Sequence, residues 1–276
     1  MHKQLNSLFA NRRRTEAIGK LACAALLTTT TALCASDPDG VTLINQASLL
    51  AAGTPYTITQ AGSYRLSSNL GANSIVISIQ AANVTLDLNG FSILTTASGI
   101  ISNGPGTAIL NGFVTGLGAG KAMGNGLTFY QPTARVDHVT VSNFSTGIAG
   151  TSDLTVSNST VSANGNWGID CDGGSLVVSN SIVSGNYTGI GAGGTAALLT
   201  GNTIAGSTLH GVNIHATGTG ATVTNNTILG NGGAGVATAG ITGIGSNTFA
   251  GNRSGDWIGV GPVSMKNNVC GGGTVC

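Results

Sequence analysis

Apolar and polar residues alternate along this chain in short runs that are typical of β-strands. Residues 84–88 alternate apolar with polar side chains, and residues 91–93 resume the alternation after Asn89 and Gly90. An interruption of one or two residues predicts a corner between two strands, because Asn and Gly tolerate the left-handed backbone that a sharp corner needs.

Weaker copies of this strand–corner–strand unit recur to the end of the chain. Their centres lie at Asn89, Asn111, Asp137, Asn158, Asn180, Asn202, Asn226, Asn247 and Asn268. A period of about 22 residues indicates a solenoid. Stacked amides can donate to the next coil's carbonyl oxygen, so we predict a structural ladder of Asn89, Asn111, Asn158, Asn180, Asn202, Asn226, Asn247 and Asn268.

A second pattern follows each later corner by about ten residues. A glycine there precedes a β-branched residue, as in Gly147-Ile148, Gly168-Ile169, Gly189-Ile190, Gly211-Val212 and Gly235-Val236. This pattern predicts a third strand in each coil. A leucine-rich repeat has a similar period and also carries an Asn, but it needs Leu at most apolar positions. Val, Ile and Thr dominate here, which favours an all-β parallel β-helix of about nine coils over residues 75–276.

Residues 36–74 lack the repeat, and we assign them to a small N-terminal cap. Residues 47–52 suit a short helix that ends at Gly53. Residues 56–59 and 64–66 alternate like strands, and the loop between them predicts a hairpin. A cap is expected because the end of a solenoid exposes unpaired backbone groups and an open core.

Composition and the N-terminus bear on location and partners. Charged residues make up 7% of the 276 residues and the net charge is +1, which argues against a nucleic-acid partner. No apolar run has the length of a membrane-spanning helix. Residues 1–35 combine basic residues, a short apolar run at 21–27 and small residues near Ala35, which predicts a signal peptide. The paired arginines leave a twin-arginine route open, and a disordered cytosolic tail is the alternative.

Export would place the remaining cysteines in an oxidising compartment. Cys270 and Cys276 are separated by a flexible Gly-rich spacer, and we expect a disulfide between them. Cys171 would then lack a partner, and we interpret it as a small buried hydrophobic residue. We expect no metal site at the two C-terminal cysteines, since neither has a His beside it.

The segment 177–190, with its strand, Asn corner, second strand and Gly-Ile element, resembles the parallel β-helix repeat of the pectin-lyase-like superfamily. It is most similar to the repeats of secreted bacterial right-handed β-helix proteins, and the resemblance covers roughly residues 75–270. It implies a right-handed parallel β-helix. It does not imply one activity, because the superfamily includes lyases, hydrolases, adhesins and non-enzymatic binding proteins. The Asn-Thr-Asp, Asp-Asp and Gly-His-Gly motifs of the polygalacturonase-like members are absent, as is an Arg beside two clustered acids.

One group of polar residues could form a site on the third strands. If Ile169, Ile190 and Val212 occupy the same inward position of three successive coils, Asp170 and Asp172 point outward over Gly191 and Gly193. The next coil then presents Asn213 and His215 at the same two positions. At about 4.8 Å per coil, Asp172 and His215 would lie about 10 Å apart across a shallow groove, and the two carboxylates about 6.6 Å apart along the strand. Asp170, Asp172, Asn213 and His215 are therefore the predicted ligand-binding residues.

Three interpretations of this group stay open: solvated polar residues, a binding groove, or a catalytic site. We expect a monomeric exported protein, secreted, periplasmic or in the cell envelope, that binds a polysaccharide or cell-surface polymer without catalysis. A polysaccharide lyase or glycoside hydrolase is the alternative, and an adhesin module is a further one. The sequence supports no cofactor, no metal site and no specific role for calcium.

Overall fold

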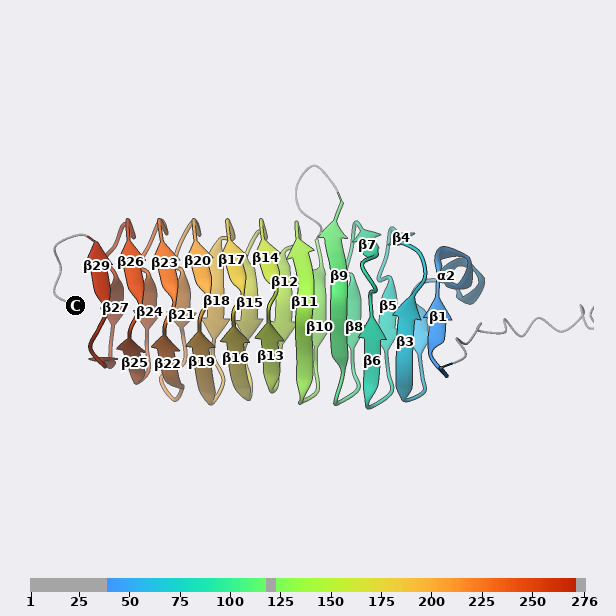
Figure 1. Cartoon of the computed structure of the whole chain (residues 1–276), viewed down its shortest axis with the longest axis horizontal. Coiled ribbons are helices and arrows are strands. Elements are labelled where there is room, and N and C mark those ends of the chain that lie inside the picture. Colours follow the sequence, from blue (N-terminus) through green and yellow to red (C-terminus); the bar gives the residue numbers. More distant parts are fainter. Residues whose placement is uncertain (1–38, 118–122, 272–276) are drawn as a thin grey trace, which may run out of the picture. The chain divides into compact units, whose positions relative to one another are not determined.

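The computed structural model describes residues 39–117 and 123–271. The predicted signal peptide at residues 1–35 and Cys276 lie outside the described residues. Within the described part, each coil runs from one parallel sheet to another and stacks on the coil before it (Figure 1). This arrangement confirms the predicted all-β parallel solenoid.

One sheet contains 19 of the described strands, which lie on both sides of the corner. In chain order these strands are β1 (Thr42–Ile44), β3 (Gly62–Leu66), β4 (Leu70–Ala72), β6 (Val84–Asp87), β7 (Ser92–Thr95), β9 (Ala108–Gly116), β11 (Ala134–Ser142), β13 (Leu154–Ser157), β14 (Thr160–Ser162), β16 (Ser175–Ser179), β17 (Ile182–Ser184), β19 (Ala196–Thr200), β20 (Thr203–Ala205), β22 (Gly220–Thr224), β23 (Thr227–Leu229), β25 (Thr242–Gly245), β26 (Thr248–Ala250), β28 (Pro262–Ser264) and β29 (Val269–Gly271).

The other sheet contains ten described strands, and we refer to it as the third-strand sheet. Its strands are β2 (Tyr56–Ile58), β5 (Ile77–Ile79), β8 (Ile100–Ser102), β10 (Asn125–Phe129), β12 (Thr146–Gly150), β15 (Trp167–Cys171), β18 (Thr188–Ala192), β21 (Val212–Ile214), β24 (Val236–Thr238) and β27 (Trp257–Gly259). The predicted Gly–β-branched elements open its later strands.

The core is a stack of aliphatic side chains that repeat from coil to coil. Ile148, Ile169, Ile190, Val212 and Val236 are paired in register along the third-strand sheet, and all are fully buried. Alternation along each strand sends the neighbouring side chains outward. The register predicted from Ile169, Ile190 and Val212 is therefore confirmed.

The beginning of the solenoid differs from the predicted hairpin. β2 pairs in parallel with β5 in the third-strand sheet, whereas β3 pairs in parallel with β1 and β6 in the other sheet. The residues between β2 and β3 therefore connect two sheets, so the hairpin prediction was wrong. The solenoid has about 11 turns instead of nine, because the first turns stack in register without an Asn-Gly corner that would reveal them.

A short helix, α2 (Gln46–Ala52), replaces a strand in the first turn and ends at Gly53 as expected. The Asn45 side chain accepts a hydrogen bond from the Ser48 amide, and the Ser48 hydroxyl accepts one from the Asn45 amide. This reciprocal capping satisfies two backbone donors at the start of the helix. Leu49 points into the core and is fully buried, so α2 covers apolar surface in the first coil.

The eight predicted ladder asparagines occupy two adjacent positions of the corner. Asn89, Asn111, Asn158 and Asn180 have left-handed backbones, with φ between 50° and 56°, and are exposed. They make other contacts: the Asn158 amide, for example, donates to Asp137 at 2.8 Å. The predicted single ladder is therefore corrected, because the left-handed residue of a corner directs its side chain outward and the residue after it faces the core.

The next position carries the buried ladder. Asn202, Asn226 and Asn247 each donate their backbone and side-chain amides to the side-chain oxygen of the following asparagine, at 2.9–3.2 Å, and the ladder ends on Asn268. Ser159 and Ser181 hold the same position in earlier coils. The Ser159 backbone amide donates to the Ser181 hydroxyl oxygen, and the Ser181 backbone amide donates to the side-chain oxygen of Asn202. These bonds satisfy polar groups that would otherwise be buried without partners.

A second buried ladder lies before the third strands and explains the glycines there. Its asparagines are Asn164, Asn186, Asn231 and Asn252, with amide-to-oxygen bonds of 2.8–2.9 Å in the pairs Asn164–Asn186 and Asn231–Asn252. A Cβ on Gly147, Gly168, Gly211 or Gly235 would come within 2.6–2.9 Å of a ladder amide nitrogen. The glycines therefore provide the space that the amides fill.

Ser207 interrupts the second ladder, and its hydroxyl oxygen is buried without a hydrogen-bond partner among the described residues. Gly189 still leaves space beside it, since a Cβ there would lie 3.2 Å from that oxygen. We predict that Ser207→Asn raises the free energy of unfolding by about 1 kcal/mol, because the introduced amide joins Asn186 and Asn231. Ser207→Ala is the matched control and should leave stability nearly unchanged in a urea titration. A destabilised Ser207→Asn variant would contradict this account of the ladder.

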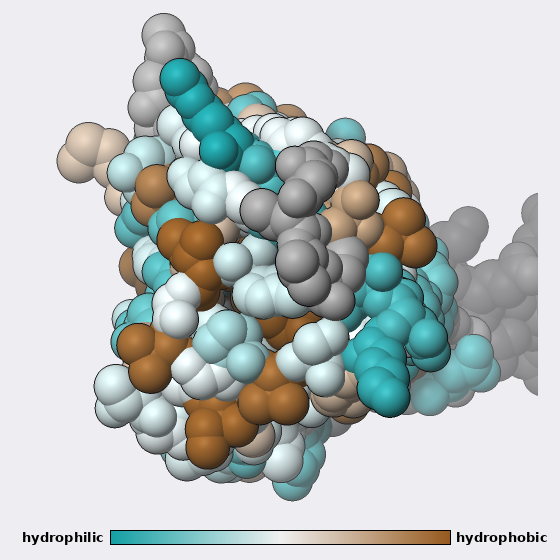
Figure 2. Space-filling model, turned by 90° about the vertical axis from the view of Figure 1, so that its left-hand side faces the viewer, coloured by the Kyte–Doolittle hydropathy of each residue, from teal (hydrophilic) through white to brown (hydrophobic). Residues whose placement is uncertain are grey.

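The last coil presents apolar side chains at the end of the solenoid. Figure 2 views this end and shows hydrophobic residues gathered on it. Exposed residues in this coil include Val260, Val263, Met265 and Val269. Cys270 is disulfide-bonded, and because Cys276 lies outside the described residues, the pairing with Cys276 stays a prediction. None of the helices in the described ranges has the length and hydropathy that a membrane span requires.

Candidate functional site

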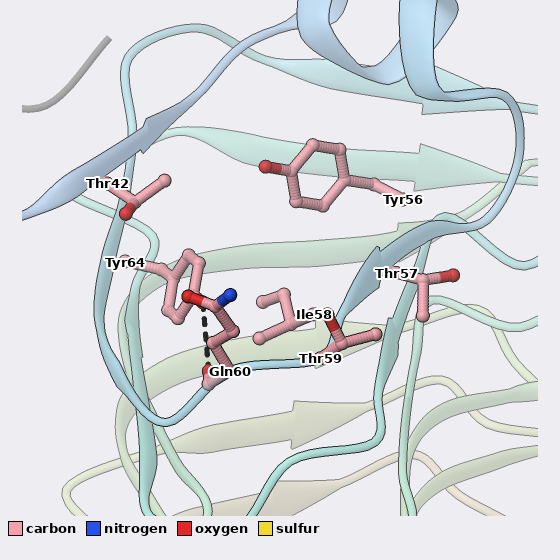
Figure 3. Close-up of a pocket in the computed structure, with 7 residues that line it drawn as sticks. All are labelled: Thr42, Tyr56, Thr57, Ile58, Thr59, Gln60 and Tyr64. Carbon is pink, nitrogen blue, oxygen red and sulfur yellow. Dashed lines mark hydrogen bonds between the residues drawn. The ribbon is translucent and has the colours of Figure 1, made fainter. Parts of the chain in front are cut away.

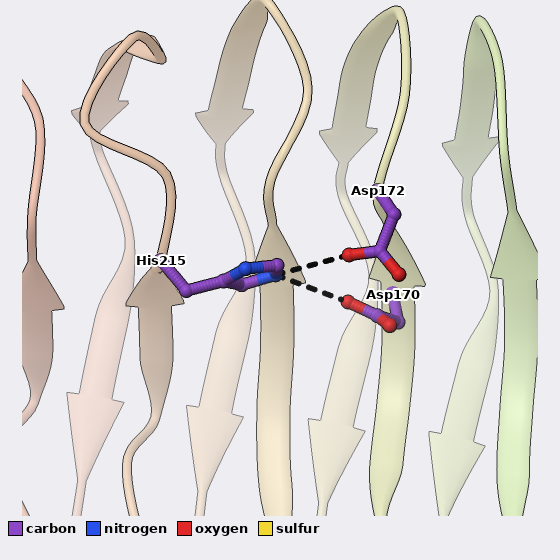
Figure 4. Close-up of side chains that lie close together, drawn as sticks. All are labelled: Asp170, Asp172 and His215. Atoms are coloured by element: carbon purple, nitrogen blue, oxygen red, sulfur yellow. Dashed lines mark ion pairs between the residues drawn. The ribbon is translucent and has the colours of Figure 1, made fainter.

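Three of the four predicted site residues come together on the outer face of the third-strand sheet. Asp170 lies on β15, and Asp172 and His215 directly follow β15 and β21 (Figure 4). Asp170 is in register with Gly191 of β18, which is in register with Asn213 of β21. The backbone bonds from Asp172, Gly193 and His215 to the preceding coils continue the same register beyond the strands. We refer to Asp170, Asp172 and His215 as the carboxylate–imidazole cluster.

The His215 side chain spans the coil that separates it from the two acids. Its Nε2 lies 3.5 Å from Oδ1 of Asp170 and 3.5 Å from Oδ1 of Asp172. The separation of about 10 Å predicted from coil spacing was therefore wrong for the side chains, although the backbones are two coils apart. The prediction counted coil spacing alone and left out the reach of the imidazole across a residue without a side chain.

Gly193 makes this crossing possible. A Cβ at this position would clash with Cε1 of His215 and would lie 3.0 Å from Oδ1 of Asp172. Gly191 likewise leaves space for the Trp167 ring, which would lie 2.7 Å from a Cβ at this position. The two glycines are thus covered by neighbouring side chains, so the predicted open groove above them is instead a packed surface.

Trp167 is the part of the site that the repeat pattern did not connect to the cluster. Its ring centroid lies 5.5 Å from that of His215, at an interplanar angle of 39°. The contact fixes one side of the imidazole and leaves the indole half-buried at the surface. Strand alternation gave no signal for this contact, since Trp167 is in register with Thr188 of the next coil and lies an odd number of residues from Asp170.

The electrostatics of the cluster are dominated by Asp170. Burial raises the pKa of Asp170 to about 6, and the nearby carboxylate of Asp172 adds to the increase, while His215 opposes it. Its Oδ1 atom is buried and has no hydrogen-bond partner among the described residues. Asp172, by contrast, has a side chain that is 67% exposed. Asp170 is therefore partly buried, whereas Asp172 faces solvent.

The two carboxylates are closer than the sequence suggested. The ligand atoms of Asp170, Asp172 and His215 all lie within 4.8 Å of one another, compared with the roughly 6.6 Å expected from strand geometry. Inverting glycosidases need roughly 6.5–9.5 Å between their carboxyl groups to admit a water molecule. The two carboxylates are therefore closer together than an inverting glycosidase requires.

The fourth predicted residue, Asn213, stays apart from the cluster. Its backbone is in register with Gly191 and Ala237. Within residues 39–117 and 123–271, no hydrogen bond or ion pair joins its side chain to Asp170, Asp172 or His215. Asn213 therefore borders the cluster without belonging to it.

Trp257, His210 and Cys171 lie away from the cluster in structural surroundings. Trp257 packs edge-on against Phe249, with ring centroids 5.6 Å apart, next to the core. His210 accepts a hydrogen bond from the Ala234 amide, and burial lowers its pKa. Cys171 is a free, buried cysteine, as expected, and burial raises the pKa of its thiol to about 11.

Two surface cavities lie away from the cluster. One has a volume of about 260 Å³ and is formed by β1, β2, β3 and the residues between them, including Tyr56, Gln60 and Tyr64 (Figure 3). The Tyr64 hydroxyl donates to the Gln60 carbonyl across it, at 2.9 Å. The other, of about 310 Å³, lies over β11, β13 and β16. Neither brings together several titratable side chains as the cluster does.

Comparison with known proteins identifies the family. The family described as "Right handed beta helix region" matches residues 125–272, more than half of the chain. The chain therefore belongs to this family, and the predicted right-handed parallel β-helix is confirmed. No curated protein matches the chain.

Solved structures show the same fold at low sequence identity. The chain is similar to the Dettilon tailspike protein, at 15% identity and a TM-score of 0.52, over 83% of this chain and 58% of that chain. It is also similar to the enzymatically active domain of bacteriophage CBA120 tailspike protein 2 (12%, TM-score 0.45, covering 81% and 42%). A third is the Azotobacter vinelandii mannuronan C-5 epimerase A-module (13%, TM-score 0.31, covering 83% and 88%). The chain thus spans less than two thirds of either tailspike structure, and at these identities the likeness concerns the fold alone.

Gly193→Ala tests how the cluster is built. The added Cβ should displace the imidazole of His215 from the two acids and expose it. We predict that the rate of His215 modification by diethyl pyrocarbonate, followed by mass spectrometry, then approaches that of His138, whose side chain is 61% exposed. Gly218→Ala is the matched control, because nothing lies within 4 Å of a Cβ there. An unchanged rate at His215 in Gly193→Ala would show that the imidazole does not lie over Gly193.

Proposed function

We propose that this chain is an exported, non-catalytic and monomeric protein that binds a polysaccharide or another surface polymer along the outer face of the third-strand sheet. The observation that carries the proposal is the carboxylate–imidazole cluster beside Trp167, on a face whose positions repeat from coil to coil. Carboxylates and imidazoles bind hydroxyl groups, and an indole provides an apolar face for a sugar ring.

The cluster is part of a longer row of polar and aromatic side chains. Tyr130, Thr151, Asp172 and His215 occupy the same position after their strands, with Gly193 between the last two, as their backbone hydrogen bonds to the preceding coils show. Tyr130 is 48% exposed. Successive coils are about 4.8 Å apart, so a linear polymer lying along the solenoid axis could contact several members of the row at once.

Export is supported by the composition of residues 1–35, with basic residues before a short apolar run. It is also supported by the disulfide-bonded Cys270, since disulfides persist in oxidising compartments. We place the protein outside the cytoplasm, secreted, periplasmic or in the cell envelope. Low overall charge favours a partner recognised by hydrogen bonds and stacking over nucleic acid.

A polysaccharide-cleaving enzyme is the second candidate function. Two carboxylates and an imidazole close together, with one carboxylate partly buried, are groups that general acid–base catalysis uses. The separation of the carboxylates fits an inverting hydrolase poorly and is closer to the roughly 5–5.5 Å of a retaining one. We rank binding first because the motifs of the polygalacturonase-like members are absent. Formation of unsaturated ends or reducing sugars from the bound polymer would favour the enzyme.

Binding to a panel of neutral and uronic-acid polysaccharides tests the proposal. We predict that replacing the exposed groups together, Asp172→Asn with His215→Gln, lowers the affinity for the polymer that the native protein binds. The expected loss is at least about tenfold, or about 1.4 kcal/mol. Asp39→Asn with His138→Gln is the matched control, since it makes the same chemical changes elsewhere. Equal affinities of both double variants and the native protein would exclude the cluster as the binding site.

A further inference from the structure

We propose that Asp170, Asp172 and His215 bind one divalent transition-metal cation of the zinc class. Neither the sequence patterns nor the family match assigned a metal to this chain, and no metal site was expected. The inference does not depend on polymer binding, because its donors and its test concern the cluster alone.

The distances within the cluster fit a shared cation better than hydrogen bonds. Nε2 of His215 lies 3.5 Å from each of two carboxylate oxygens, beyond the usual 2.7–3.2 Å of an N–H···O bond. With metal–ligand distances of about 2.0–2.1 Å, two ligand atoms of a tetrahedral zinc are separated by about 3.3–3.4 Å. The third separation, between the carboxylate oxygens, is at most 4.8 Å, and rotation of the exposed Asp172 side chain can shorten it.

One oxygen of the partly buried Asp170 side chain also fits a bound cation. Oδ1 of Asp170 is inaccessible to solvent and has no hydrogen-bond partner among the described residues, and only 16% of its side chain is exposed. Such an oxygen beside a second carboxylate is unfavourable in its ionised form, and a bound cation would compensate for it. The imidazole that faces this oxygen packs against Trp167 and lies over Gly193, which has no side chain to displace it.

The donor types select the class of metal. Imidazole nitrogen suits zinc, copper, nickel and iron, whereas calcium and magnesium prefer oxygen donors alone. Three protein ligands leave a fourth position, which the solvent exposure of Asp172 would keep open to water or to a hydroxyl group. The structure therefore favours a zinc-class ion over calcium.

A second histidine–aspartate pair, His138 and Asp137, differs from the cluster in the partners of its carboxylate and in the number of acids. His138 lies 3.2 Å from Asp137, but the Asp137 oxygens already accept hydrogen bonds from Arg135, Ser157 and Asn158 at 2.8 Å. Burial tends to raise the pKa of Asp137, but the hydrogen bonds from Asn158 and Ser157 and the contact with His138 lower it to about 2. Its carboxylate is thus already compensated, and a single acid cannot form a three-ligand site. This pair is a matched control within the same molecule.

The test is titration of tag-free, chelator-treated protein with zinc chloride by calorimetry, with Co²⁺ absorption as a second readout. We expect one zinc ion per chain and a tetrahedral Co²⁺ spectrum that zinc abolishes. His215→Ala should weaken zinc binding by at least about 100-fold, because loss of an outer-shell partner alone costs 10- to 100-fold. Asp172→Asn should weaken it at least tenfold, and His138→Ala should leave it unchanged.

Two results would overturn the proposal. One is no saturable zinc binding by the native protein, and the other is equal binding by the native protein, Asp172→Asn and His215→Ala. Asp172 is mostly exposed, so Asp172→Asn should keep the melting temperature of the metal-free protein and report on the site alone. Because no polymer is present, the outcome is separate from that of the polymer-binding experiment.

Discussion

The whole structure depends on the stacking of each coil in register with the one before it. Parallel pairing places equivalent residues directly above one another, so a polar group that turns inward at one coil meets the same kind of group in the next. Between Asn202 and Asn268 this produces a buried ladder in which the side-chain oxygens of Asn226, Asn247 and Asn268 each accept two amide donors from the preceding coil. The ladder allows sharp corners without leaving buried donors and acceptors unpaired.

Because the coils stack closely, a glycine in one coil leaves space that a side chain of a neighbouring coil fills. Glycines at the beginning of the third strands leave the space in which the second ladder's amides lie. On the outer face, Gly191 and Gly193 leave space that Trp167 and His215 fill from the neighbouring coils. Glycines thus make space for neighbouring side chains at the surface as they do in the interior. At the surface this space lets His215 reach acids whose backbone lies two coils away.

These relations decide what could be predicted from the sequence. The period, the corners and the inward row of Ile169, Ile190 and Val212 were predictable, since they depend on strand alternation alone. The ladder was misplaced by one residue in coils with an Asn-Ser corner, because exposed and buried corner positions both favour Asn. The contact between His215 and the acids was missed, because side-chain reach across a glycine is not part of a repeat count.

A crystal structure of the metal-free protein at high resolution would test the central claim most directly. The account predicts the His215 imidazole lying over Gly193, with Nε2 about 3.5 Å from the nearest oxygens of Asp170 and Asp172 and the indole of Trp167 beside it. An imidazole that extends into solvent, with ordered water over Gly193 and the two acids apart from it, would contradict the account.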